Sequence, residues 1–131
     1  MSMLVDYVRV YESIEHSSSA NVTFQVNMEE QLAHETGVYI SGGTIGSGFP
    51  GGIEMEDPEG DKIWSVTLSL PKSSVHTYKF RNGYFPGTWS GGWEEVPNAC
   101  SVDENNNRQF IVSVADTILS PACFSRCTDC D

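Results

Sequence analysis

Aromatic side chains gather in one glycine-rich segment of the chain, residues 82–96. This segment contains four aromatic residues, Tyr84, Phe85, Trp89 and Trp93. Core aromatics normally lie on strands among aliphatic residues, whereas this segment has no aliphatic side chain before Val96. An exposed aromatic ring can cover the apolar C–H face of a pyranose while nearby polar groups bind the hydroxyls. The segment therefore predicts a sugar-binding surface, and the alternative is that the rings only pin a long loop to the domain.

Side chains that could perform catalysis are poorly placed in this sequence. Glu94 and Glu95 are adjacent, and neighbours on a strand point to opposite faces, so they do not flank a glycosidic bond as paired carboxylates must. The three histidines have no Ser or Cys partner in a nucleophile motif. We therefore expect a domain without catalytic residues and without a cofactor.

The charge of the chain limits the partners that it can bind. Seven basic residues against eighteen acidic residues give a formal net charge of -11, which repels phosphate backbones and anionic lipid surfaces. We therefore expect neither nucleic acid nor membrane partners, whereas neutral glycans are compatible with this charge.

A short acidic segment is the candidate for a metal site. Asp57, Glu59 and Asp61 alternate with Pro58 and Gly60, and their oxygens could bind calcium. The segment lacks the length and the terminal Glu of an EF-hand loop, so a solvated turn between strands is the favoured interpretation.

Four cysteines lie in the last third of the chain, and they are Cys100, Cys123, Cys127 and Cys130. An even count of this kind predicts two disulfides formed in an oxidising compartment, with three possible pairings that the sequence leaves open. We expect Cys100 to bond to one of the other three and the remaining two to pair. Zinc is the alternative, but the tail trio lacks a second well-separated ligand pair, and no histidine lies nearby.

The elements that position these residues are short strands. Alternation predicts strands over 22–28, 37–41, 64–70, 75–81, 108–114 and 117–119. On the first of these, Val22, Phe24, Val26 and Met28 share a face, and Trp64 is expected in the core because it alternates with Val66 and Leu68. About seven turn-separated strands in a 131-residue chain predict an all-β, immunoglobulin-like antiparallel sandwich.

The start of the chain has the sequence pattern of a separate strand followed by a linker. Residues 3–12 alternate as a strand does, and residues 13–20 then have the serine-rich polar composition of a linker. The run Val-Asp-Tyr-Val-Arg-Val-Tyr (5–11) resembles the closing strand of family-sixteen glycoside hydrolases, especially laminarinases and related β-1,3-glucanases. This resemblance implies residues 1–12 as the last strand of an upstream glucanase domain, residues 13–20 as a linker, and residues 21–131 as the sandwich with its disulfide-linked tail.

A second resemblance covers residues 22–114, which look like the starch-binding domain superfamily. The motifs that carry it are Val-Tyr-Ile-Ser-Gly (38–42), Ile-Gly-Ser-Gly-Phe (45–49), Ile-Trp-Ser-Val-Thr-Leu-Ser-Leu-Pro (63–71), Tyr-Lys-Phe (78–80), Trp-Glu (93–94) and Asn-Arg (107–108). Residues from 100 onward also look like modules attached to bacterial laminarinases.

The starch-binding resemblance implies positions for a sugar platform. Carried over by motif, it places Phe49, Lys79 and Trp93 in the platform, with Glu94 beside the last; Trp89 and Tyr84 join them as candidates from the aromatic segment. The sequence has Phe49 where the family usually has Trp, and it inserts residues 97–106 between Trp-Glu and Asn-Arg. Both departures put specificity for α-glucan in doubt.

Taken together, these features predict a secreted bacterial carbohydrate-binding module that is not an enzyme itself. We expect it to bind a neutral polysaccharide of the β-1,3-glucan (laminarin) type and to hold a catalytic domain of the same polypeptide at its substrate. An α-glucan-binding module, and a structural spacer or adhesion domain without sugar binding, are the alternatives.

Overall fold

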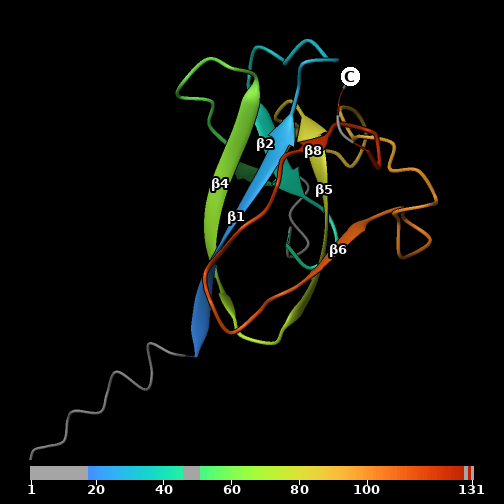
Figure 1. The fold of residues 1–131 in the computed structure, drawn as a ribbon. Coiled ribbons are helices and arrows are strands. Elements are labelled where there is room, and N and C mark those ends of the chain that lie inside the picture. The colour runs from blue at the N-terminus through green and yellow to red at the C-terminus, as the bar shows by residue number, and fades with distance from the viewer. Residues whose placement is uncertain (1–17, 46–50, 129, 131) are drawn as a thin grey trace, which may run out of the picture.

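The computed structural model describes residues 18–45, 51–128 and 130. These residues form two β-sheets that pack against each other (Figure 1). The strands are β1 (Ser19–Asn27), β2 (Val38–Ser41), β3 (Ile53–Glu54), β4 (Ile63–Pro71), β5 (Val75–Asn82), β6 (Arg108–Ile111), β7 (Thr117–Ile118) and β8 (Ala122–Cys123). The predicted all-β sandwich is confirmed. No helix of the described residues is long and apolar enough to cross a membrane.

Each sheet contains four strands. In the first sheet β1 lies between β4 and β7, pairs antiparallel with β4 and parallel with β7, and also pairs parallel with β8. In the second sheet the order is β3-β2-β5-β6, with antiparallel pairing throughout. The first sheet is therefore mixed, which differs from the purely antiparallel sandwich that the sequence predicted.

The core lies between the inner faces of the two sheets. Val22, Phe24 and Val26 of β1 are fully buried, as their alternation predicts. Phe24 packs edge-on against Tyr78 of β5, with ring centroids 4.9 Å apart. Burial of each such side chain stabilises the fold by about 1.5–3 kcal/mol. Because Tyr78 points inward, Lys79 lies on the opposite, outer face of β5.

The predicted strand 108–114 is shorter in the structure. Regular pairing with β5 ends at Ile111, and Val112 exchanges two backbone hydrogen bonds with the turn between β4 and β5, at Ser73 and Ser74 (2.9 Å each). Val112 is buried, but the chain then turns away and leaves Val114 73% exposed. Val114 therefore does not share the buried face of Val112, as continued alternation along the predicted strand would require. The two-residue strands β3 and β8 were not predicted, because so short a segment carries no alternation.

Two disulfides tie the end of the chain to the sandwich. Cys100 bonds to Cys127, and Cys123 bonds to Cys130. This confirms the prediction that Cys100 pairs with a tail cysteine and that the other two pair together. All four sulfurs are thus in disulfides, which leaves none of them as a thiolate ligand for zinc.

Some predicted features lie outside the described residues. They are the strand at residues 3–12, most of the linker 13–20, and Phe49 of the expected platform.

Candidate functional site

The aromatic segment leaves β5 and returns alongside its end. Gly92 accepts a hydrogen bond from the backbone N–H of Asn82 (2.6 Å), and the backbone N–H of Glu94 donates to the carbonyl of Phe80 (3.0 Å). Between these bonds, Trp93 forms a β-bridge with Arg81. Backbone pairing therefore fixes Trp93 beside β5, with its side chain on the outer face of the second sheet. Residues 83–91 form a loop over that face.

Trp89 and Trp93 lie side by side on this outer face. Their ring planes are 10° apart and their centroids are 6.3 Å apart, within the range of an offset aromatic stack. The indole N–H of Trp93 donates to the carbonyl of Trp89 at 2.8 Å. Trp93 is half-buried and Trp89 is 55% exposed, so the prediction that these rings reach the surface is confirmed.

Both indoles line an open hollow of about 420 Å³. The residues around it are Gly42, Gly43, Lys79, Trp89, Trp93, Asn105 and Asn107. The Nζ of Lys79 lies 5.7 Å from the centroid of a Trp93 ring, which confirms that Lys79 and Trp93 are neighbours. The hollow thus combines apolar rings with an ammonium donor and amide groups.

Gly42 keeps part of this hollow open. Its φ is +77°, and a Cβ added there would lie 3.2 Å from Oδ1 of Asn107 and 3.6 Å from the Trp93 ring. Glycine adopts this left-handed backbone without strain. A side chain at this position would be strained and would also intrude between the residues that line the hollow.

Asn107 and Asp103 were not predicted from the sequence as residues of the site. Asn107 is only 4% exposed, and its Nδ2 donates to the carboxylate of Asp103 at 3.0 Å. The same carboxylate accepts the backbone N–H groups of Asn107 and Asn105. These hydrogen bonds, that of the Asn107 side chain first, lower the pKa of Asp103 below its ordinary value. Because Nδ2 is bound to Asp103, Oδ1 of Asn107 is directed toward Gly42 and the hollow.

Arg81 organises the aromatic loop from beneath. It lies on the outer face of β5 yet is fully buried, because the loop covers it. Its guanidinium donates to the carbonyls of four loop residues, which are Phe85, Thr88, Ser90 and Gly91. Burial lowers the pKa of Arg81. Its Cζ also lies 4.4 Å from the centroid of a Trp93 ring, so the guanidinium occupies part of that ring's surface.

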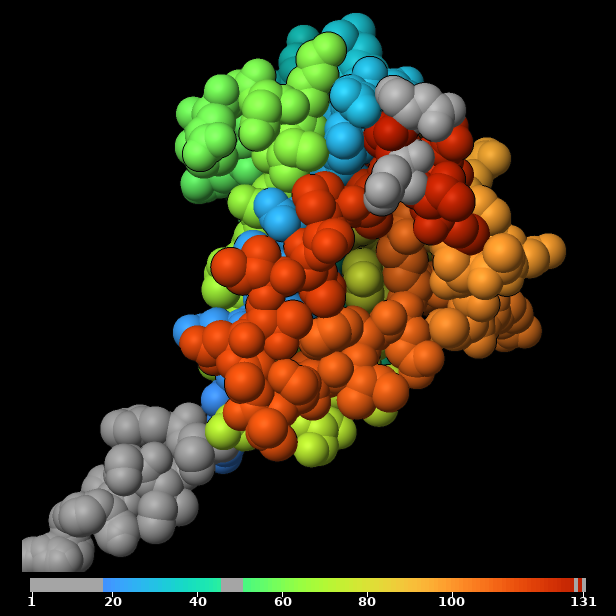
Figure 2. Space-filling view, in the orientation of Figure 1, coloured from blue at the N-terminus to red at the C-terminus, as the bar shows by residue number. Residues whose placement is uncertain are grey.

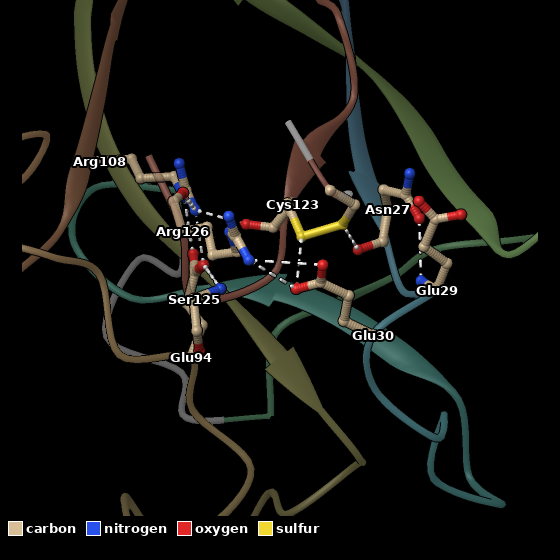
Figure 3. Close-up of a disulfide and its surroundings, with 9 residues drawn as sticks. Asn27, Glu29, Glu30, Glu94, Arg108, Cys123, Ser125 and Arg126 are labelled. Atoms are coloured by element: carbon tan, nitrogen blue, oxygen red, sulfur yellow. Dashed lines mark hydrogen bonds and ion pairs between the residues drawn. A yellow bond between two sulfur atoms is a disulfide. The ribbon is translucent and has the colours of Figure 1, made fainter. Parts of the chain in front are cut away.

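Glu94 does not line the hollow beside Trp89, although the resemblance placed it next to Trp93 in the platform. Its side chain has no exposed surface, and its carboxylate forms two 2.8 Å hydrogen bonds with the guanidinium of Arg108 (Figure 3). The backbone N–H groups of Phe80 and Ser125 donate to the same carboxylate at 3.0 and 2.9 Å. Since Trp93 points outward, its neighbour on the bridged segment must point inward. The carboxylate of Glu94 therefore links β5, β6 and the C-terminal segment through its hydrogen bonds to Phe80, Arg108 and Ser125.

Tyr84 and Phe85 also lie apart from the two tryptophans. Tyr84 is 42% exposed and stacks on Tyr39 of β2, with ring centroids 5.1 Å apart. Phe85 packs against His34 at 5.4 Å and against the guanidinium of Arg81 at 5.1 Å. Phe85 thus pins the loop, as the alternative interpretation held, and Tyr84 does not line the hollow.

The acidic segment at residues 57–61 forms a turn. Both carboxylate oxygens of Asp57 accept backbone N–H groups, from Asp61 at 3.2 Å and from Lys62 at 3.0 Å. Asp61 in turn accepts the N–H of Ile63 at 3.0 Å. These bonds match the predicted turn between strands.

No known family model matches the chain, and no curated protein matches it. Among solved structures, the chain is similar to a glycoside hydrolase family 15 glucoamylase from Hypocrea jecorina, with a TM-score of 0.57 and 18% sequence identity. The match covers 82% of this chain and 17% of the glucoamylase chain. At this level of identity the likeness concerns the fold, and this chain spans less than a fifth of the protein that it matches.

Proposed function

We propose that this domain is a non-catalytic carbohydrate-binding module that binds a neutral glucan. The observation that carries the proposal is the pair of parallel indoles, Trp89 and Trp93, beside a hollow lined by Lys79 and Asn107. Tryptophan rings that are already held in place and reach the surface can take the apolar face of a sugar ring with little loss of conformational entropy. The ammonium and the amide then bind hydroxyls at the edge of the same ring.

Preorganisation supports this proposal. Arg81 holds the loop of Trp89 through four carbonyls, and Asp103 fixes the amide of Asn107. A site whose side chains are already in place avoids much of the ordering cost of binding. The net charge of -11 favours a neutral ligand over a polyanion.

We infer that the preferred glucan is β-1,3-linked, as in laminarin. Support comes from the resemblance of residues 5–11 to the closing strand of β-1,3-glucanases, which implies a linked catalytic domain of that specificity. In such a protein the module raises the local concentration of the enzyme at its substrate, outside the cell, where its disulfides are stable.

An α-glucan is the second candidate ligand. The starch-binding motifs in residues 22–114 and the fold similarity to a glucoamylase favour it. Both candidate ligands would bind to the same surface of the protein. They differ in the curvature of the glucan chain that would cross this surface.

Affinity electrophoresis tests the proposal directly. The chain is run in native gels that contain laminarin, soluble starch or no polysaccharide, with bovine serum albumin as the non-binding reference. We expect retardation in laminarin and less or none in starch. Stronger retardation in starch would assign the module to α-glucan, and equal mobility in all gels would refute sugar binding.

A further inference from the structure

A second hollow adjoins the one beside the tryptophans. It has a volume of about 750 Å³ and is also open to solvent. Its lining includes Gly91, Gly92, Glu94, Glu95, Val96, Pro97, Asn98 and Asn106, and it shares Lys79 and Trp93 with the first hollow. The side chain of Glu94 itself has no exposed surface. The two hollows therefore meet at Trp93, one extending toward Trp89 and the other toward Asn98.

One segment, residues 97–107, contributes to both hollows. Asn105 and Asn107 line the first hollow, and Asn98 and Asn106 line the second. The region of the chain that contains this segment is drawn in orange and forms a protruding edge of the molecule (Figure 2). Four amide side chains of this segment thus line the two hollows, and amides can donate to and accept from sugar hydroxyls.

The same segment is held in place at several points. Cys100 is bonded to Cys127, and the backbone N–H groups of Cys100 and Ser101 both donate to the carbonyl of Pro97 at 3.1 Å. Asp103 fixes the other end through its bonds to Asn105 and Asn107. A wall built in this way is preorganised and does not need to be ordered by the ligand.

We propose that the two hollows act as one groove that binds an internal stretch of a neutral glucan chain, running across Trp93 from Trp89 to Asn98. The inference rests on the proposed function. It specifies that the protein binds sugars within the glucan chain and not the sugar at the end of that chain. A site that recognises a chain end needs a closed wall against the terminal sugar, whereas both hollows are open.

The charges along the groove fit the same ligand. Lys79 is the one cationic residue that lines either hollow in the described ranges, and Glu95 is an exposed carboxylate in the second. A polyanionic glycan with one acidic group on each sugar would face a single ammonium and a nearby carboxylate. A neutral chain meets amide side chains in both hollows and is not repelled by the carboxylate.

Isothermal titration calorimetry with a ladder of laminarin oligosaccharides, from the disaccharide to the hexasaccharide, tests the proposal. Because only a longer chain can occupy both hollows at once, affinity should rise about tenfold or more along the ladder. Borohydride reduction of the hexasaccharide changes only its reducing end and should leave its affinity unchanged. If the protein prefers α-glucan, the same ladder is made of malto-oligosaccharides.

A pair of variants tests whether the gain in affinity with chain length comes from the second hollow. Asn98→Ala, which alters only the second hollow, should weaken hexasaccharide binding severalfold and leave disaccharide binding unchanged. Asn21→Ala is the matched control, since Asn21 is exposed on β1 and lines neither hollow. Equal affinity for all lengths, loss of binding on reduction, or no effect of Asn98→Ala would overturn the groove while sugar binding stands. Failure of every glucan to bind would instead overturn the proposed function and the groove with it.

Discussion

Replacing Glu94 with Gln separates a structural role of this residue from a ligand role. The carboxylate accepts two bonds on each oxygen: one from Phe80 N–H and one from Arg108 Nε on Oε2, and one from Arg108 Nη2 and one from Ser125 N–H on Oε1. Gln has nearly the same shape, but one of its two terminal atoms is an NH₂ group. In either orientation that NH₂ group faces two donors.

The loss of stability can be worked out from these contacts. Glu94→Gln removes the negative charge beside Arg108, which is 9% exposed, and leaves two donors without an acceptor. In the native protein burial lowers the pKa of Arg108, but the hydrogen bond and charge of Glu94 raise it overall. The substitution removes both of these contributions and leaves the buried guanidinium without its counter-ion. Breaking a buried pair by removing one partner costs about 3–5 kcal/mol.

Chemical denaturation of Glu94→Gln should therefore show a free energy of unfolding lower by about 3–5 kcal/mol. Laminarin affinity, measured under conditions in which the variant is still folded, should change less than about twofold, because the side chain of Glu94 has no exposed surface. Normal stability combined with weak glucan binding would refute this reasoning and would indicate that the side chain of Glu94 contacts the sugar.

Three further predictions concern the segments that support the site. Asp103→Asn should weaken glucan binding severalfold with little change in melting temperature, because Asn107 loses its anchor; the same loss should appear in calorimetry as pH falls through the lowered pKa of Asp103. Burial raises the pKa of Tyr78 to about 12, above the unfolded value of about 10. The folded state then keeps its proton longer than the unfolded state, so urea denaturation should show the free energy of unfolding falling by about 2–3 kcal/mol between those pH values. Replacing Cys100 and Cys127 with Ser opens a bridge of sequence separation 27, and denaturation should show a loss of about 3.5 kcal/mol in the chain-entropy model.

The core and the disulfides could be predicted because they follow from local patterns. Val22, Phe24 and Val26 alternate on one strand, and burying one face of a sheet leaves little freedom of register. The even cysteine count constrains the pairing, although the choice of Cys127 as the partner of Cys100 depends on the folded path of the tail.

The site could be predicted only in part. Trp89, Trp93 and Lys79 lie where the aromatic segment and the strand indicate. Tyr84 could not be separated from them, because the direction of a loop side chain depends on contacts such as the one with Tyr39. The burial of Glu94 follows from the β-bridge of Trp93, and a sequence does not show which loop residues return to a sheet edge.

Asn107, Asp103 and Arg81 were missed for a related reason. Polar residues in a loop are usually solvated, and only the folded loop shows that Asp103 fixes Asn107. The role of Arg81 has one indication in the sequence. Arg81 is a charged residue near the end of a strand, directly before a glycine-rich loop whose backbone carbonyls need hydrogen-bond donors.

Titration of laminarin into the Trp89→Ala variant tests whether the indole pair binds glucan. Trp89 is 55% exposed, so its removal should leave the melting temperature almost unchanged, while loss of the stacking surface should weaken binding about tenfold or more. Tyr84→Ala is the matched control, because Tyr84 is an exposed ring of the same loop that does not line the hollow. We expect a large loss of affinity for Trp89→Ala and none for Tyr84→Ala. Unchanged affinity in Trp89→Ala, or an equal loss in both variants, would show that the indole pair is not the glucan-binding surface.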